Sequence, residues 1–540
     1  MNKPIPSATV EIAPTCLPPW TTGDLPEPAP LQWRHWTSFI GPGLVMMGIQ
    51  IGGGEWLFGP EITARYGGGL MWLATIAIVL QVFYNIECGR YALYCGEPIM
   101  TGFLRKRPGP AFWMGVVLLL SLGALIPGLS TSGAAVLAAL WLDRPPTVED
   151  KGLVTGIAYA CLGLVALPVL VGGKVYNMLQ VIMTTKVVVV LGFCLIVGGA
   201  FVGIGHWRDI FSGFLLFGNV PVTDDAGREQ VQNAFLHYLR EGEWPVIVLS
   251  NIAVLGAFAG YAGGGGLANS TYSNYVRDKG WGMGREVGAI ASAVGGRNIT
   301  LSHVGAVFPL TAENLRRWRG WWRYILTDQI CIWAPGCFMG MALPALLSIE
   351  FAPHSQLYEQ TQKLDWAQAV ITADGIRHAP QFSAGLQQIL WTATLLVGLL
   401  VLLPSQMSIV EDFSRRWTDI IWSGSRHARE SLQGGQVRII YYGILFTYVA
   451  WTFVCAWGFN TWGTPKLMVI VIANLNNLAI GFTSFLLLWV NRTLLPKALR
   501  PRWYHQLGVA ACGLFYLGLA LLVFVTKQWP VLRELLTGAG

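Results

Sequence analysis

Charged side chains are scarce in this chain. Asp, Glu, Lys and Arg together make up 12% of the 540 residues, whereas hydrophobic residues make up 53% and the mean hydropathy is +0.49. A soluble protein of this length needs far more charge to cover its surface, so the composition excludes an ordinary soluble domain. We therefore expect an all-α membrane protein, because helices that face lipid satisfy their own backbone groups.

Histidine and cysteine are also few, with eight and nine residues. The histidines show no paired spacing, and the cysteines lie mostly in or beside apolar runs, which is typical of small buried side chains and not of disulfides or a metal cluster. The apolar segments contain no nucleophile–base pair, so we expect neither an enzyme nor a cofactor. The net charge of +7 follows membrane topology and does not indicate a nucleic-acid partner.

The chain contains many long apolar runs. Eleven segments are each about 20 residues or longer, enough to cross a hydrocarbon core of about 30 Å. They lie at 38–64, 70–94, 112–142, 153–171, 178–204, 246–272, 324–349, 384–404, 439–458, 467–490 and 507–526.

The basic residues predict the orientation. With the N-terminus inside, the inner loops hold about 24 Lys and Arg and the outer loops about 11, as the positive-inside rule requires. Residues 1–37 are rich in proline and lack the apolar core of a cleaved leader, so we expect a disordered cytoplasmic arm. The sequence thus predicts a multi-pass protein of the cell (inner) membrane. We expect a monomer, although no residue pattern indicates the oligomeric state.

The first span breaks in its middle. Gly52, Gly53 and Gly54 stand in a row, and each glycine costs a helix about 1 kcal/mol relative to alanine. The carboxylate of Glu55 follows directly, and a charge near the bilayer midplane is costly unless something pairs with it. A broken helix with a charge at the break is how many secondary transporters build a substrate site.

The sixth span repeats this feature with the tract Gly263 to Gly266. Segments five spans apart enter the membrane from opposite sides, so two matching breaks predict a LeuT-type 5+5 inverted repeat with the eleventh span appended. Glycines that only permit close helix packing are the alternative. The predicted organisation is an arm at 1–37, a first repeat at 38–204, an extracellular loop at 205–244, a second repeat at 245–490 and a final helix with a tail at 491–540.

Several stretches resemble the Nramp family of divalent-metal transporters. They are Gly41-Pro-Gly-Leu, Ala64-Arg-Tyr-Gly with Leu70-Met-Trp, Gly89-Arg90 through Gly96, and Ser132-Gly-Ala-Ala-Val. The resemblance implies the LeuT-type fold of eleven or twelve helices, and it weakens after the sixth span.

The departures from the family pattern remove its metal chemistry. Where the family has Asp-Pro-Gly-Asn this chain has Gly52 to Glu55, and where the family has Met-Pro-His it has Gly263 to Gly265. The thioether that selects soft transition metals is absent. The acidic pair that the family carries in its third helix matches Pro127 and Ser130 here. The resemblance therefore implies a relative without the usual metal ligands or proton route.

Unwound glycines expose backbone N–H groups, which favour a carboxylate or another anion. We therefore expect a small solute, such as an amino acid or another organic zwitterion or anion, bound between the two breaks. The predicted substrate-binding residues are Gly52, Gly53, Gly54, Glu55, Gly263, Gly264, Gly265, Gly266, Asn269 and Asn476. For Asn476, hydrogen bonding between helices is the alternative.

Lys186 lies inside the fifth span, roughly 14 Å deep. In some proton-coupled amino-acid transporters of this fold, a lysine on helix 5 occupies the place where relatives bind sodium, and Lys186 is similar in span and depth. Lys186 is either the group that couples transport to protons or a lysine that snorkels to the interface. Glu61 is either a gate or a wall of the outer vestibule. Glu411 and Asp412 are expected to be solvated just beyond the eighth span, and Asp328 has no partner that the sequence names.

Two other functions remain open. Glu55 with backbone carbonyls could hold a hard divalent cation such as Mg²⁺ or Mn²⁺, although one carboxylate is few for a dication. A sensor that binds its ligand without moving it is the other alternative.

Overall fold

The computed structural model of the chain is predominantly helical. It describes residues 15–32, 34, 40–126, 128–165, 167–170, 174–223, 228–248, 252–291, 299–358, 367–462, 465–530 and 533. Pro127 and residues 1–14, for which we made predictions, lie outside the described residues.

The first five-span unit begins after the N-terminal strand β1 (Thr21–Thr22). Its elements are α2 (Pro42–Gln50), η2 (Gly54–Phe58), α3 (Gly59–Tyr66), η3 (Gly67–Leu70), α4 (Trp72–Cys95), α5 (Ile99–Leu104), α6 (Pro110–Leu120), η4 (Leu122–Leu125), α7 (Gly128–Leu142), η5 (Val148–Asp150), α8 (Lys151–Leu164), η6 (Leu167–Leu170) and α9 (Val175–Phe201). The long connection that follows contains α10 (Ile204–Gly213), the antiparallel pair β2 (Asn219–Thr223) and β3 (Glu229–Asn233), and α11 (Ala234–Glu241).

The second unit repeats the pattern of a short first helix pair followed by long helices. It contains α12 (Ile252–Tyr261), η7 (Gly266–Thr271), α13 (Tyr272–Asp278), α14 (Gly284–Val287), β4 (Ala306–Val307), α15 (Ala312–Leu326), η8 (Thr327–Trp333), α16 (Ala334–Phe351), η9 (Ala352–His354), α17 (Ala367–His378), α18 (Ala384–Gly424), α19 (Arg426–Ser431), η11 (Gly434–Gln436), α20 (Val437–Trp462) and α21 (Pro465–Leu494). The chain continues through η12 (Lys497–Leu499), α22 (Trp503–Val523) and η13 (Phe524–Gln528).

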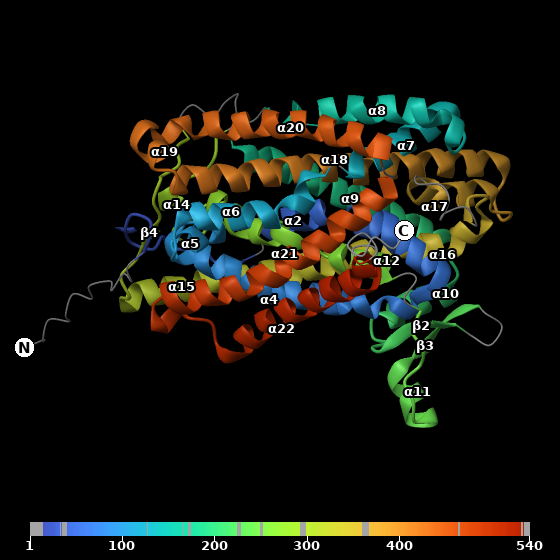
Figure 1. Cartoon of the computed structure of the whole chain (residues 1–540), viewed down its shortest axis with the longest axis horizontal. Helices are drawn as coiled ribbons and strands as arrows, with labels where there is room; N and C mark the ends of the chain where they lie inside the picture. The colour runs from blue at the N-terminus through green and yellow to red at the C-terminus, as the bar shows by residue number, and fades with distance from the viewer. Residues whose placement is uncertain are drawn as a thin grey trace, which may run out of the picture.

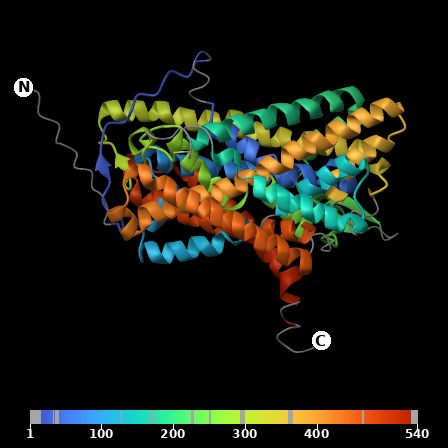
Figure 2. The ribbon, with the colours of Figure 1, turned by 90° about the horizontal axis from the view of Figure 1, so that it is seen from above.

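Eight helices in the described part of the chain are long and apolar enough to cross a membrane. The other three predicted spans fall short for local reasons. The first and sixth are each divided at their glycine tract, and the fourth forms a helix of 14 residues in α8. The long helices run along one common direction, which is the horizontal axis of Figure 1 and also of the view from above in Figure 2. The hairpin β2–β3 and α11 project from one end of this bundle (Figure 1).

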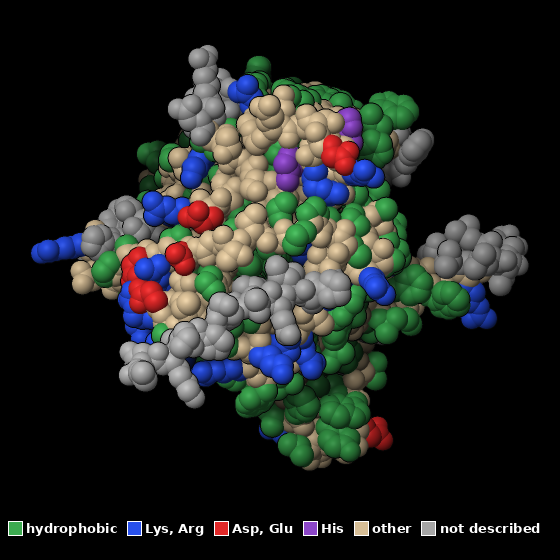
Figure 3. All heavy atoms as spheres, turned by 90° about the vertical axis from the view of Figure 1, so that its left-hand side faces the viewer, with side chains coloured by type: hydrophobic (Ala, Val, Ile, Leu, Met, Phe, Trp, Pro, Cys, Tyr) green, Lys and Arg blue, Asp and Glu red, His purple; other side chains and the backbone are tan. Residues whose placement is uncertain are grey.

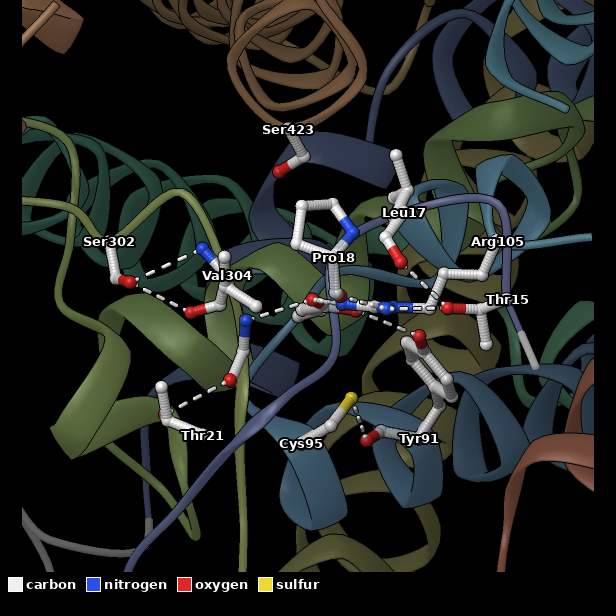
Figure 4. Close-up of polar contacts among 12 residues, drawn as sticks. Thr15, Leu17, Pro18, Thr21, Tyr91, Cys95, Arg105, Ser302, Val304 and Ser423 are labelled. Carbon is white, nitrogen blue, oxygen red and sulfur yellow. Dashed lines mark hydrogen bonds and ion pairs between the residues drawn. The ribbon is translucent and has the colours of Figure 1, made fainter. Parts of the chain in front are cut away.

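The N-terminal arm reaches the opposite end of the bundle. We expected this arm to be disordered, but its residues 15–32 pack on the helices. Thr21 and Thr22 pair in parallel with Ala306 and Val307, and the Arg105 guanidinium donates to the carbonyl oxygen of Pro18 at 2.8 Å. Figure 4 shows Arg105 reaching toward Thr15 and Pro18 of the arm. We refer to residues 15–32 as the strap.

Further along, the strap lies against α15. Arg317 donates to the carbonyl oxygen of Leu25 at 2.9 Å, and the Trp321 indole donates to that of Pro26 at 2.7 Å. Seen end-on in Figure 3, this end of the molecule carries many Lys and Arg side chains among apolar ones. The cytoplasmic location of this end stays a prediction.

The eighth span is much longer than its apolar run. The helix α18 continues through Pro404 to Gly424, although proline removes one backbone hydrogen bond from a helix. The expectation that Glu411 and Asp412 are solvated is wrong, because both side chains are buried. Glu411 and Asp412 pair with Arg415 and Arg416, one helical turn further along.

Candidate functional site

The first span is interrupted where the sequence predicts it. α2 ends at Gln50, Ile51 and Gly52 leave the helical conformation, and the chain resumes through the π-helical turn η2 into α3. The Gly52 N–H donates to Oε2 of Glu55 at 2.9 Å. A carboxylate that reaches back three residues to a backbone N–H forms half of a capping box, so Glu55 caps the helix that restarts here.

The sixth span is interrupted between α12 and η7. Gly263, Gly265 and Gly266 have φ angles of 91°, 70° and 62°, in the left-handed region that glycine adopts without strain. Gln81 of α4 holds this irregular segment in place. Its Oε1 accepts from the Gly264 N–H at 2.8 Å and the Gly265 N–H at 3.4 Å, and its Nε2 donates to the carbonyl oxygen of Ala262 at 2.7 Å.

Both interruptions face one cavity of about 80 Å³. The polar or glycine residues that line it come from four of the predicted spans and from the part of α18 beyond Pro404. They are Gln50, Gly52 and Gly53 of the first span, Ser121 and Gly123 of the third, Tyr261, Gly263, Gly264 and Gly265 of the sixth, Ser405, Ser408, Asp412 and Arg416 of α18, and Asn476 of the tenth. The shared cavity agrees with the prediction that the two glycine tracts meet at the centre of the fold.

Three of the backbone N–H groups at the breaks are not bare, contrary to what the sequence led us to expect. Glu55 occupies the N–H of Gly52, and Gln81 occupies those of Gly264 and Gly265. The unpaired buried atoms around the breaks are instead oxygens, Oε1 of Glu55 and Oδ1 of Asn269. In the part of the chain that the structure describes, these three glycine amides are therefore closed to an anion.

Lys186 lies beside the break in the first span. Its Nζ donates to Oγ of Ser405 at 2.6 Å, and Oγ of Ser405 lies 3.4 Å from the carbonyl oxygens of both Ile49 and Ile51. The side chain of Lys186 is fully buried, and it is close enough to Glu55 for an electrostatic interaction. The lysine therefore connects α9 and α18 to the unwound backbone, and it does not snorkel to an interface.

The other predicted residues lie at varying distances from the cavity. Gly54 packs directly on Tyr261, and Asn269 donates to Gln81 and Asn85 at 2.9 Å each behind the cavity wall. Gly266 faces the amide of Asn476. Glu61 accepts a hydrogen bond from Gln368 of α17, so α3 is linked there to the second repeat.

Sequence reasoning missed Gln81, Asp412 and Arg416. Gln81 had a signal, since it and Asn85 are amide side chains in the apolar run at 70–94. The pairs Glu411–Arg415 and Asp412–Arg416 were also visible in the sequence, because opposite charges four residues apart indicate that a helix continues. We did not use this pattern, since the predicted span ends at Pro404.

A network of buried ion pairs lies beside the cavity. It joins α13 to α18 and combines Arg277–Asp278 at 2.8 Å, Arg277–Asp419, Arg415–Asp278 and Arg415–Glu411, while the neighbouring pair Arg416–Asp412, at 2.8 Å, lines the cavity itself. Buried charges are stable only when each is paired, so this network fixes the two helices relative to one another.

Among the described residues, no group of three or more His, Cys, Asp and Glu side chains is placed to hold a metal ion. Glu55 is the single acidic residue at the breaks, and one of its oxygens already accepts from Gly52.

Comparison with known proteins identifies the fold. No family model matches the chain, and no curated protein matches it. Among solved structures, the manganese transporter of Eremococcus coleocola in complex with an aromatic bis-isothiourea compound matches with a TM-score of 0.57 and 12% identity, covering 96% of each chain. A single-residue mutant of that transporter matches with a TM-score of 0.59 and 12% identity, covering 96% of this chain and 94% of that chain. Mhp1, a nucleobase-cation-symport-1 family transporter, matches more loosely, with a TM-score of 0.47 and 13% identity over 93% of this chain and 96% of that chain.

At this identity the likeness shows the fold alone. The chain is an all-α, multi-pass membrane protein with a LeuT-type 5+5 architecture, interrupted at the centres of its first and sixth spans. Within that class its architecture is similar to that of the manganese transporter.

Proposed function

We propose that this chain is a secondary active transporter that moves a small solute by alternating access. The observation that carries the proposal is that both interrupted helices end on one central cavity. In this class of fold one repeat or bundle rocks against the other around a fixed central site formed by interrupted helices, which opens the site to either side in turn.

The cavity fits a small metabolite. A volume of about 80 Å³ is on the order of the space that three liquid waters take, at about 30 Å³ each. Such a space suits only a very small solute, on the scale of a small amino acid, an organic acid or another short zwitterion. We therefore propose an amino acid or another small organic zwitterion or anion as the substrate.

Lys186 is the proposed coupling group. Its ammonium holds Ser405, which touches the carbonyl oxygens at the break of the first span. Loss of the proton would remove the charge that holds these three elements together. We propose that proton binding to Lys186 and the state of the first span are linked in this way, and that protons drive transport.

Divalent cation transport is the second candidate. It is favoured by the fold shared with a manganese transporter and by the unpaired Oε1 of Glu55. A single carboxylate is a weak site for a dication, which usually takes several oxygen ligands.

Uptake by the purified protein in liposomes tests the proposal. Labelled amino acids, small organic acids, Mn²⁺ and Mg²⁺ are offered with and without a proton gradient. We expect uptake of an organic solute that Gly264→Leu abolishes, because a side chain there collides with Gln50 and Asn269. Gly192→Leu is the matched control, since a Cβ at Gly192 meets nothing within 4 Å.

Two further variants separate the roles within the site. Glu55→Gln should weaken uptake of a cationic or zwitterionic solute, with the exposed Glu241→Gln as its control. Lys186→Met should abolish stimulation by the proton gradient. Uptake of Mn²⁺ or Mg²⁺ alone would favour the second candidate, and binding without uptake would indicate a sensor.

A further inference from the structure

The end of the cavity that lies away from the breaks is formed by an ion pair of α18. Asp412 and Arg416 both line the cavity, and both side chains are buried. Ser405 and Arg416 are eleven positions apart on one helix, so the lining positions of α18 span about 16 Å of the helix. Asp412 and Arg416 are the charged residues among those that line it.

Asp412 and Arg416 differ in how many of their polar atoms have hydrogen-bond partners. Asp412 accepts from Oγ1 of Thr271 through one oxygen and from Nη2 of Arg416 through the other, at 2.8 Å for the second contact. Arg416 uses only Nη2. Its Nε and Nη1 are buried and have no hydrogen-bond partner within the part of the chain that the structure describes.

Unpaired donors of a buried guanidinium are costly, because each has lost its water without gaining an acceptor. The neighbouring cations do not share this position on the cavity. Arg415 pairs with Glu411 and Asp278, and Arg277 pairs with Asp278 and Asp419, on the side of α18 that faces α13. Arg416 is thus the cation that faces the cavity with donor capacity to spare.

The chemistry that satisfies such a group is an oxyanion. Guanidinium N–H groups form strong, charge-assisted hydrogen bonds with the oxygens of a carboxylate. Three of the glycine amides that would otherwise attract an anion, those of Gly52, Gly264 and Gly265, are occupied by Glu55 and Gln81. Arg416 therefore offers a substrate carboxylate free donors that these three amides do not.

We propose that Arg416 binds the anionic group of the substrate, and that the substrate class is a small carboxylate or a zwitterion that carries one. This inference rests on the proposed function, since it assigns one end of the same cavity. It moves the anion-binding position from the glycine tracts of the first and sixth spans to the eighth span.

Binding to the purified full-length protein tests the assignment. The probes are glycine, L-alanine and propionate, together with glycinamide, alaninamide and propionamide, which have the same shape without the carboxylate. We expect at least one acid to bind to the wild-type protein at least 100-fold more tightly than its amide. Arg416→Gln should weaken binding of that acid at least 100-fold, and Arg416→Lys should weaken it less.

The control variant is Arg426→Gln, which removes an arginine of the same region whose side chain is 83% exposed. It should bind the acid like the wild type. If Arg416→Gln does not fold, Arg416→Lys replaces it, and the acid should bind this variant more weakly than the wild type while the amide binds both alike.

The assignment is overturned if amides bind as well as acids, if none of the acids binds to the wild-type protein, or if Arg416→Gln binds them with wild-type affinity. The proposed function can fail separately. Carboxylate binding that depends on Arg416, without uptake in liposomes, would contradict transport and leave the site standing. Uptake of a neutral or cationic solute that Arg416→Gln leaves unchanged would contradict the assignment of Arg416 and leave the transport function standing.

Discussion

Gly54 and Tyr261 join the two interrupted helices with no space between their backbones. A Cβ added to Gly54 would lie 2.6 Å from Cβ of Tyr261 and 2.8 Å from its carbonyl oxygen. Tyr261 is the last residue of α12, and Gly54 is the first of η2. The close approach therefore fixes the distance between the two breaks that border the cavity.

The first prediction concerns this contact. Gly54→Ala forces backbone against backbone, and overpacking of this kind costs about 1–3 kcal/mol. We expect a lower thermal unfolding midpoint in detergent and loss of uptake. Gly192→Ala in α9 is the control, and it should raise the unfolding midpoint slightly. Its Cβ enters open space, and alanine favours a helix over glycine by about 0.5–1 kcal/mol. Equal effects of the two substitutions on stability would contradict the proposed contact.

The second prediction concerns Gln81, which satisfies the irregular backbone of the sixth span from a neighbouring helix. Gln81→Leu leaves the Gly264 N–H and the Ala262 carbonyl oxygen without this partner. Each orphaned buried group costs about 1–3 kcal/mol, so we expect a total of about 2–6 kcal/mol and a midpoint lower by several degrees. Gln381→Leu, at an exposed position, should leave the midpoint unchanged. Thermal unfolding monitored by tryptophan fluorescence provides the measurement.

The third prediction concerns Asp328, which the structure provides with partners that the sequence did not name. Its Oδ1 accepts from the Gly43 N–H at 2.9 Å, and its Oδ2 accepts from the Tyr272 hydroxyl at 2.8 Å. The carboxyl group thus connects the start of α2 to α13. Asp328→Ala leaves the Gly43 N–H unpaired at a cost of about 1–3 kcal/mol, so hydrogen exchange in α2 should accelerate about fivefold or more.

A matched control exists beyond the other end of the same span. The Gly68 N–H donates to Oδ2 of Asp209 at 2.9 Å, so Asp209→Ala should accelerate exchange in η3 and leave α2 unchanged. Exchange in α2 that stays at the wild-type rate in Asp328→Ala would show that Asp328 does not hold the helix start.

The fourth prediction concerns the strap and its dependence on pH. Glu97 lies in the loop after α4, where it pairs with Arg105 and accepts from the Gly305 N–H at 2.8 Å. Burial opposes its ionisation, but Arg105 outweighs this effect and lowers the pKa of Glu97 below its ordinary value. A carboxyl group with a lowered pKa in the folded state contributes stability that is present above its unfolded pKa of about 4.3 and is lost as the pH falls through the folded value.

We therefore expect the wild type to unfold at a higher temperature than Glu97→Gln at neutral pH, with a constant difference down to about pH 5. Below about pH 4.3 the difference should shrink, because the Glu97 carboxyl group is protonated first in the unfolded chain and, at still lower pH, in the folded protein. Arg105→Gln should also release the strap, which trypsin cleavage at Arg34 would report at neutral pH. A difference between wild type and Glu97→Gln that grows in acid would contradict this account.

The sequence by itself determined the membrane architecture and the positions of both breaks. Apolar length and scarce charge are read directly from the chain, since lipid demands helices that satisfy their own backbone. The glycine tracts Gly52 to Gly54 and Gly263 to Gly266 weaken a helix locally, so the positions of the breaks can be predicted without knowing which side chains pack around them. Lys186 likewise stood out as a charge in an apolar run.

Only the tertiary structure decided which groups at the site remain available. Gln81 meets Gly264 across 183 positions of sequence, and Thr271 meets Asp412 across 141. Whether a glycine amide is free, or whether Arg416 lacks partners, depends on such distant side chains and cannot be read from spacing. The same holds for the strap, whose polar and proline-rich composition indicates disorder until α15 and Arg105 supply the partners that order it.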